Sequence, residues 1–128
     1  MKCKELMVGD FCRSGHGLPM QITNVGYDYA YATFEGNEGE PWEFDDKDEQ
    51  PQPIPLTPEI LEKNGWERNG IFMEKRIDEN IHLSWADICG SVLFQGNYYM
   101  CECNYVHTLQ HALKLRGFDK LADNFKVV

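Results

Sequence analysis

The chain has 128 residues, of which 42% are hydrophobic, so it can bury the core of one compact domain and is not a disordered chain. Its formal net charge of −9 repels phosphate backbones, which argues against direct binding to nucleic acid. No apolar run approaches the roughly 20 residues of a membrane helix, and residues 1–5 lead into no signal peptide, so we expect a cytoplasmic protein with no membrane partner.

Five cysteines are spread along the chain, at Cys3, Cys12, Cys89, Cys101 and Cys103. An odd number at irregular spacing does not fit the disulfide framework of a small secreted protein. We therefore expect reduced thiols, most of them buried as small hydrophobic side chains.

Short segments rich in strand-forming residues alternate with glycine-containing turns in the first third of the chain. They are Phe11 to Arg13, Met20 to Val25, Tyr29 to Phe34 and Pro41 to Phe44. Several short strands at intervals of about ten residues are typical of a small antiparallel barrel or meander. The sequence therefore predicts an N-terminal lobe, residues 1–56, built on a small β-barrel.

A charged and then proline-rich connector spans residues 45–55, and a short helical segment follows it. Alternate prolines cannot donate ladder hydrogen bonds and favour an extended strap; a proline-rich ligand for another domain is the alternative. Thr57 can cap the helix, Pro58 suits its first turn, and Gly65 can end it. About seven residues cannot hold a helix alone in water, so we expect it to pack as a joint between two β-rich halves.

The second half of the chain has four more segments with strand character and then a helical one. The strand segments are Ile71 to Ile77, Ile81 to Trp85, Val92 to Phe94 and Tyr98 to Cys103. Their alternation predicts a four-stranded antiparallel meander with one buried face. Helical spacing of apolar residues from Tyr105 to Arg116 predicts a C-terminal helix that covers this sheet, whereas residues 119–128 carry no clear pattern. The predicted fold class is α+β, with the second lobe at residues 57–128 and both lobes in one compact unit.

Four short motifs carry a resemblance to known proteins: Gly9 with Asp10, Ile-Pro-Leu-Thr at 54–57, Asn-Gly-Trp at 64–66 and Tyr-Val-His-Thr-Leu-Gln at 105–110. In these motifs and their order the chain resembles, over nearly its whole length, a group of small uncharacterised proteins of gut Bacteroidetes and their prophages or mobile elements. The resemblance implies an architecture and no activity. The strand rhythm of the first half also resembles an SH3-like barrel, a fold that serves many unrelated functions.

Cysteines and histidines near the C-terminus are the candidate metal ligands: Cys101, Cys103, His107 and His111. The Cys-x-Cys and His-x3-His spacings could in principle supply four zinc ligands. On a helical wheel, however, both histidines lie on the side opposite Leu109, so we expect them to point to water while the cysteines point inward. Ligands that face opposite ways cannot converge on one ion. Cys101, Cys103 and His111 also depart from the usual pattern of the group, so any chemistry on them would be particular to this chain.

Acidic residues concentrate between residues 35 and 49, and aromatic residues lie beside them. Aromatic side chains at an exposed surface are typical of protein interfaces. The candidate protein-binding residues are Tyr29, Tyr31, Trp42, Glu43, Asp45, Asp46, Asp48 and Glu49. If Phe34 faces the core, Tyr29 and Tyr31 point outward; in the alternative, the two tyrosines form the core and keep only their hydroxyls in water.

The sequence contains no phosphate-binding loop, no dinucleotide-binding motif and no nucleophile elbow, and we expect no cofactor. The favoured function is a non-enzymatic protein-binding or adaptor protein, and a basic partner would suit its acidic segment. Two alternatives remain. One is an acidic DNA mimic of prophage origin that occupies a host nucleic-acid-binding protein, and the other is a metal-dependent enzyme.

Overall fold

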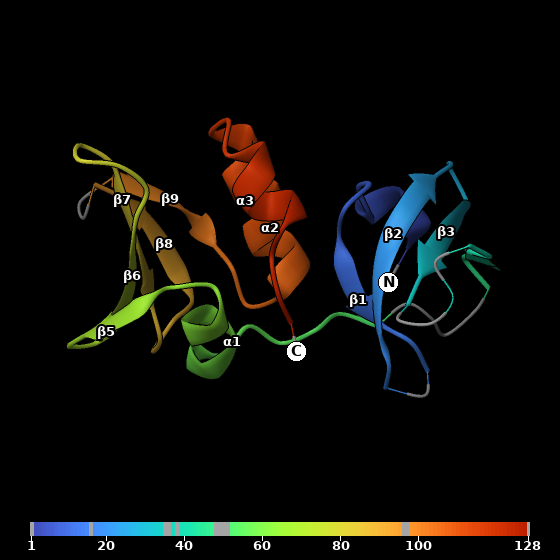
Figure 1. The fold of residues 1–128 in the computed structure, drawn as a ribbon, viewed down its shortest axis with the longest axis horizontal. Helices are drawn as coiled ribbons and strands as arrows, with labels where there is room; N and C mark the ends of the chain where they lie inside the picture. The colour runs from blue at the N-terminus through green and yellow to red at the C-terminus, as the bar shows by residue number, and fades with distance from the viewer. Residues whose placement is uncertain are drawn as a thin grey trace.

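The protein is a mixed α+β structure in which helices stand between two antiparallel sheets (Figure 1). The computed structural model describes residues 2–15, 17–34, 37, 39–47, 52–95 and 98–127. The first sheet comes from the N-terminal part of the chain, the second from the part after the proline-rich connector. The α+β fold class predicted from the sequence is therefore confirmed.

The first sheet has the strand order β1-β2-β3-β4, preceded by the 3₁₀ helix η1 (Cys3–Glu5). Its strands are β1 (Phe11–Arg13), β2 (Pro19–Val25), β3 (Tyr29–Thr33) and β4 (Trp42–Asp45). All four lie where the sequence predicts strands. Among the described residues the sheet is open, so the predicted SH3-like barrel does not close there.

The outer edge of β1, which has no neighbouring strand in the sheet, forms hydrogen bonds with other parts of the chain, and this gives a physical reason for the open sheet. The Phe11 N–H donates to the side chain of Gln110, at 2.8 Å, and Arg13 forms a β-bridge with Gln52 of the connector. These partners satisfy the backbone groups that barrel closure would otherwise pair with β4. The connector, predicted to form an extended strap, therefore pairs with β1 at one position, through the bridge between Gln52 and Arg13.

Alternation along the strands of the first sheet places small and apolar side chains on its inner face. Ala30 and Ala32 of β3 are fully buried, and Met20 and Ile22 of β2 pack with them. Cys3, Leu6, Cys12 and Phe44 complete this first core. Because successive residues of a strand face opposite ways, Tyr29 and Tyr31 lie on the outer face. This observation decides between the two orientations that the sequence leaves open.

The helix α1 (Pro58–Lys63) follows the connector, as the sequence predicts. The Thr57 hydroxyl accepts a hydrogen bond from the Ile60 N–H at 3.2 Å, and Gly65, with φ of +82°, ends the helix. Leu61 is fully buried and Trp66 nearly so. The helix is thus held by its packing, as its short length requires.

The second sheet has the order β5-β6-β7-β8-β9, one strand more than the predicted four. Its strands are β5 (Glu67–Asn69), β6 (Phe72–Arg76), β7 (His82–Ala86), β8 (Ser91–Phe94) and β9 (Tyr98–Glu102). The sequence did not predict β5 because all three of its residues are polar and exposed, so it shows no apolar alternation. It forms as an edge strand through backbone pairing with β6.

Two helices end the chain, α2 (Val106–Leu115) and α3 (Asp119–Asp123), and α3 lies in the stretch that carries no clear pattern. Val106, Leu109 and Leu113 of α2 pack with Met73, Leu83 and Trp85 in the main core, between α2 and the second sheet. The predicted C-terminal helix over the second sheet is therefore confirmed. None of the helices in the described part of the chain has the length and apolar character needed to cross a membrane.

Candidate functional site

The outer face of the first sheet carries two tyrosines opposite two carboxylates. The register of β3 and β4 pairs Tyr29 with Asp45 and Tyr31 with Glu43. The Tyr31 hydroxyl donates to Glu43 Oε2 at 2.9 Å, and this bond raises the pKa of Tyr31. The two rings meet edge to face with centroids 6.1 Å apart. We call these four residues the tyrosine–acid face.

A glycine makes room for one of these rings. A Cβ on Gly26 would overlap the ring of Tyr29, and the Gly26 N–H donates to the Tyr29 carbonyl oxygen at 2.8 Å. Gly26 does not have a positive φ, so the absence of a side chain matters here for space and not for backbone conformation. The turn before β3 thus leaves the space that the Tyr29 ring occupies.

The structure divides the eight candidate protein-binding residues of the sequence analysis. Trp42, half-exposed, lies on the other face of β4 from the tyrosines and meets Phe34 edge to face, with centroids 5.1 Å apart. Asp46 accepts a hydrogen bond from the Cys3 N–H at 2.8 Å, which holds the pKa of Asp46 below its usual range. Asp48 and Glu49 lie outside the described residues. Tyr29, Tyr31, Glu43 and Asp45 are the members that the fold brings together.

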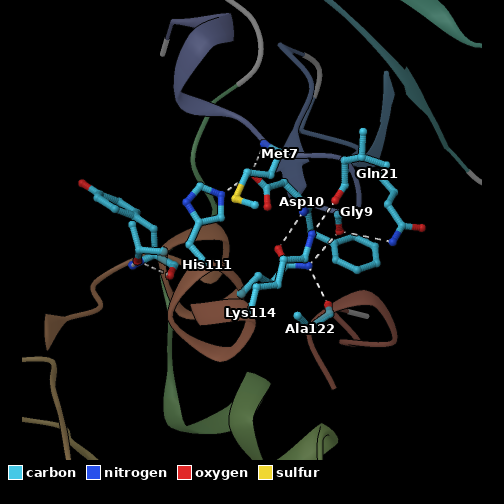
Figure 2. A network of polar contacts seen from close by, with 12 residues as sticks. Met7, Gly9, Asp10, Gln21, His111, Lys114 and Ala122 are labelled. Atoms are coloured by element: carbon cyan, nitrogen blue, oxygen red, sulfur yellow. Dashed lines mark hydrogen bonds and ion pairs between the residues drawn. The ribbon is translucent and has the colours of Figure 1, made fainter. Parts of the chain in front are cut away.

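A second polar site, the polar junction, joins the first sheet to α2 and consists of Asp10, Gln110, His111 and Lys114 (Figure 2). Gln110 is fully buried. Its Oε1 accepts from the Phe11 N–H, and its Nε2 donates to the carbonyl oxygens of Gly9 and Ala122, each at 2.8 Å. One side chain therefore ties together β1, the turn before it and α3.

Asp10 is the buried acid of the polar junction. Its Oδ2 accepts from the Met7 N–H at 2.8 Å and lies 2.7 Å from His111 Nε2 (Figure 2). Its Oδ1 has no hydrogen-bond partner among the described residues, and the same holds for Nδ1 of His107. A histidine oriented by a buried carboxylate can act as a general base. His111 and Asp10, however, are not among the residues that line the four cavities found in the described part of the chain.

The expectation that His107 and His111 point to water is wrong. His107 is buried, and the ring of Tyr105 stacks on its ring with the two centroids 6.0 Å apart. The His111 side chain is only 25% exposed. A helical wheel of α2 shows a single apolar stripe, which predicts that the opposite side of the helix faces solvent. That other side instead packs against β1 and the N-terminal turn, with polar side chains making the contacts.

Lowering the pH is expected to destabilise the protein through His107. Burial lowers the pKa of His107, and the nearby charge of His111 lowers it further, whereas Asp10 and Glu5 act in the opposite sense. The unfolded chain therefore binds a proton more readily than the folded one, and stability falls as the pH drops below about 6.5. Urea unfolding at pH 7.5 and 5.0 should show a smaller loss for His107→Gln than for the unmodified protein. Equal losses in the two proteins would contradict this assignment.

The cysteines and histidines that the sequence suggested as metal ligands do not meet. Cys101 Sγ, on β9, and Cys103 Sγ, just after the end of β9, lie 3.5 Å apart, while His107 and His111 face the polar junction. No three His, Cys, Asp or Glu side chains in the described part of the chain form a group that could hold a metal ion. The four residues therefore belong to two separate sites.

An apolar groove of about 640 Å³ lies between the first sheet and the C-terminal segment, lined by Phe11, Leu18, Phe34, Phe125 and Val127 among others. Its polar neighbours include Lys126. This groove could not be predicted from the sequence, because its walls come from opposite ends of the chain. Apolar walls beside one cation could accept an apolar group that carries a negative charge.

Comparison with known proteins adds no identity to these sites. No family model, no curated protein and no solved structure matches this chain.

Proposed function

We propose that the protein is a non-enzymatic binding protein that recognises a basic protein through its tyrosine–acid face. The observation that supports this most directly is the pair of cross-strand neighbours Tyr29 with Asp45 and Tyr31 with Glu43 on an outward-facing sheet surface. Tyrosine is enriched at the energetic centres of protein interfaces because its large ring carries a polar group.

The chemistry of this face favours a basic partner. An arginine or lysine can lie over a tyrosine ring and reach the carboxylate beside it, which combines a cation–π contact with a charge-assisted hydrogen bond. The chain's net charge of −9 also speeds the approach of a positive partner and repels a negative one. Glu43 and Asp45 supply that charge on the face itself.

Binding is expected to weaken about tenfold or more when both tyrosines are removed, because truncation of central aromatic residues commonly costs 1–2 kcal/mol or more. The variant is Tyr29→Ala with Tyr31→Ala, titrated with octa-arginine peptide while the backbone amide resonances of the whole chain are followed. The matched control is Tyr98→Ala with Tyr99→Ala, a more exposed tyrosine pair on β9. Equal weakening in the two double variants, or peptide-induced shifts away from β3 and β4, would overturn the proposal.

Two further variants separate ring position and charge from ring removal. Gly26→Ala should displace the Tyr29 ring and weaken binding, since the ring occupies the space of the new Cβ. Glu43→Gln with Asp45→Asn should reduce the salt dependence of binding, whereas Glu62→Gln with Glu67→Gln, at exposed sites elsewhere, changes the net charge equally and should have little effect. Binding of the unmodified protein that is indifferent to salt would contradict a charge-based interface.

The DNA-mimic alternative is tested with the same protein. Suppose that the protein binds a basic partner that also binds nucleic acid. Duplex DNA should then compete for this partner only if the tyrosine–acid face binds to the partner's DNA-binding site. Competition by DNA would favour the mimic, and partner binding unaffected by DNA would favour an adaptor.

A further inference from the structure

We propose that Cys101 and Cys103 form a two-sulfur binding site for trivalent arsenic that carries one organic group. Their sulfur atoms lie 3.5 Å apart, on the same side of the chain at the end of β9. Residues two apart in an extended strand share a face, so the Cys-x-Cys spacing itself produces this pair. The site lies on the second sheet, remote in sequence from the tyrosine–acid face, and does not depend on the proposed function.

The sulfur separation suits an atom that bridges the two thiols. With sulfur bonds of about 2.3 Å, as in metal–thiolate sites, sulfurs 3.5 Å apart subtend an angle of about 100° at a shared atom. This angle is below the tetrahedral value and fits a pyramidal three-coordinate centre with a lone pair. A direct disulfide would instead need the sulfurs at about 2.05 Å, and extended residues two apart are at the upper limit of its usual Cα separation.

The number of sulfurs selects the ligand. Zinc in a structural site takes four ligands, and the described residues place no third His, Cys, Asp or Glu where it could hold a metal with these two. Trivalent arsenic with one carbon substituent has two positions left, and two sulfurs fill them. Burial also raises the pKa of Cys103, which disfavours the thiolate that a metal cation requires.

The reaction with such an arsenical proceeds from neutral thiols. In water the arsenic carries its organic group and two hydroxyls. Each thiol proton leaves with one hydroxyl as water, each As–O bond is replaced by an As–S bond, and no electron is transferred. The raised pKa of Cys103 therefore does not prevent overall exchange, and arsenic stays trivalent.

The protein holds the inner thiol in place and leaves the outer one accessible. The Cys103 N–H donates to the Gly90 carbonyl oxygen at 2.7 Å, and its own carbonyl oxygen accepts from Trp85 Nε1 at 2.9 Å. Cys103 is fully buried, whereas Cys101 is partly exposed on β9, an edge strand. The first As–S bond therefore forms at Cys101, and Cys103, already fixed beside it, closes the chelate.

Phenylarsine oxide is the probe for this site, added to the reduced full-length chain and followed by mass spectrometry. We expect one arsenical per chain that withstands excess 2-mercaptoethanol and is released by 1,2-ethanedithiol. A second bond within one site commonly strengthens binding by about 10²–10⁴-fold. Cys101→Ser and Cys103→Ala should therefore each lower the affinity at least about 100-fold, whereas Cys89→Ser, at an exposed thiol, should retain it.

Several outcomes would overturn the site. Adducts of the unmodified protein that 2-mercaptoethanol removes as readily as those of Cys101→Ser would show attachment through single thiols. A monothiol-resistant adduct that survives in Cys101→Ser, or that is lost in Cys89→Ser, would place the arsenical elsewhere. If Cys103→Ala fails to fold, the result for Cys101→Ser, at the partly exposed position, decides the question.

Discussion

Replacing Gln110 with leucine is expected to lower the free energy of unfolding by about 3 kcal/mol or more. Leucine has a similar size but leaves the Phe11 N–H without its partner and removes one hydrogen bond from each of the carbonyl oxygens of Gly9 and Ala122, which still accept from Gln21 and from the Phe125 N–H. A buried polar group left unpaired costs about 1–3 kcal/mol, and each further hydrogen bond lost costs about 0.5–1.5 kcal/mol. Because Gln110 is fully buried, water cannot replace these bonds without opening the junction between the first sheet and α2.

The matched control for this change is Gln21→Leu. The Gln21 amide donates to the same Gly9 carbonyl oxygen and to that of Asp123, each at 3.2 Å, but the side chain is only half-buried (Figure 2). Its loss should cost less than about 1 kcal/mol, since water can take over the bonds. Urea unfolding followed by the fluorescence of the buried Trp66 and Trp85 measures both variants. Similar costs for the two variants would show that Gln110 does not hold the junction.

The strands that the sequence predicted well are those with one buried face. In β3 the order Tyr-Ala-Tyr-Ala shows which face is inside once the alanines are known to be buried, whereas β7 is buried on both faces from Leu83 to Ala86. Burial on one side produces a period of two in the sequence, and that period is visible without a structure. The edge strand β5 has no buried side and therefore leaves no such pattern.

The polar junction could not be predicted for a different reason. Helix α2 is covered on two sides, and the side toward β1 makes its contacts through Gln110 and His111 instead of apolar residues. A polar residue on a helical wheel is assigned to water unless its distant partner is known, and here the partners are Gly9, Asp10 and Phe11 at the other end of the chain. The division into lobes at residue 56 stays a prediction, since the junction spans it.

The proposed arsenical site and the tyrosine–acid face both depend on residues two apart in an extended chain facing the same way. The sequence, however, reveals different parts of each. The Cys-x-Cys spacing predicts a shared face, but only the structure gives the sulfur separation of 3.5 Å and the exposure of one thiol. For the tyrosines the acidic residues beside them were evident, but their pairing depends on the register of β3 with β4. Residue types could be read from the sequence, whereas distances between them required the fold.

Replacing Leu61 with alanine is expected to cost about 2–5 kcal/mol, the usual range for a leucine removed from a well-packed core. Leu61 is fully buried and packs in the main core, which includes Trp66 and Val106. It is also the only fully buried residue of α1 among the described residues, and a helix of six residues has little stability without such contacts. The loss should therefore include local unfolding of α1 as well as the cavity.

The same substitution at Leu115 provides the control, because Leu115 lies at the end of α2 and is 87% exposed. Leu115→Ala should change stability by no more than about 0.5 kcal/mol, since it creates no cavity. The backbone N–H of Trp66 donates to the Leu61 carbonyl oxygen at 3.1 Å, so Trp66 reports on the end of α1. In Leu61→Ala, the fluorescence of Trp66 should therefore change at a lower urea concentration than the circular dichroism of the sheets. Coincident transitions with a loss below 1 kcal/mol would mean that α1 does not depend on Leu61, and that the connector and the sheets hold the helix by themselves.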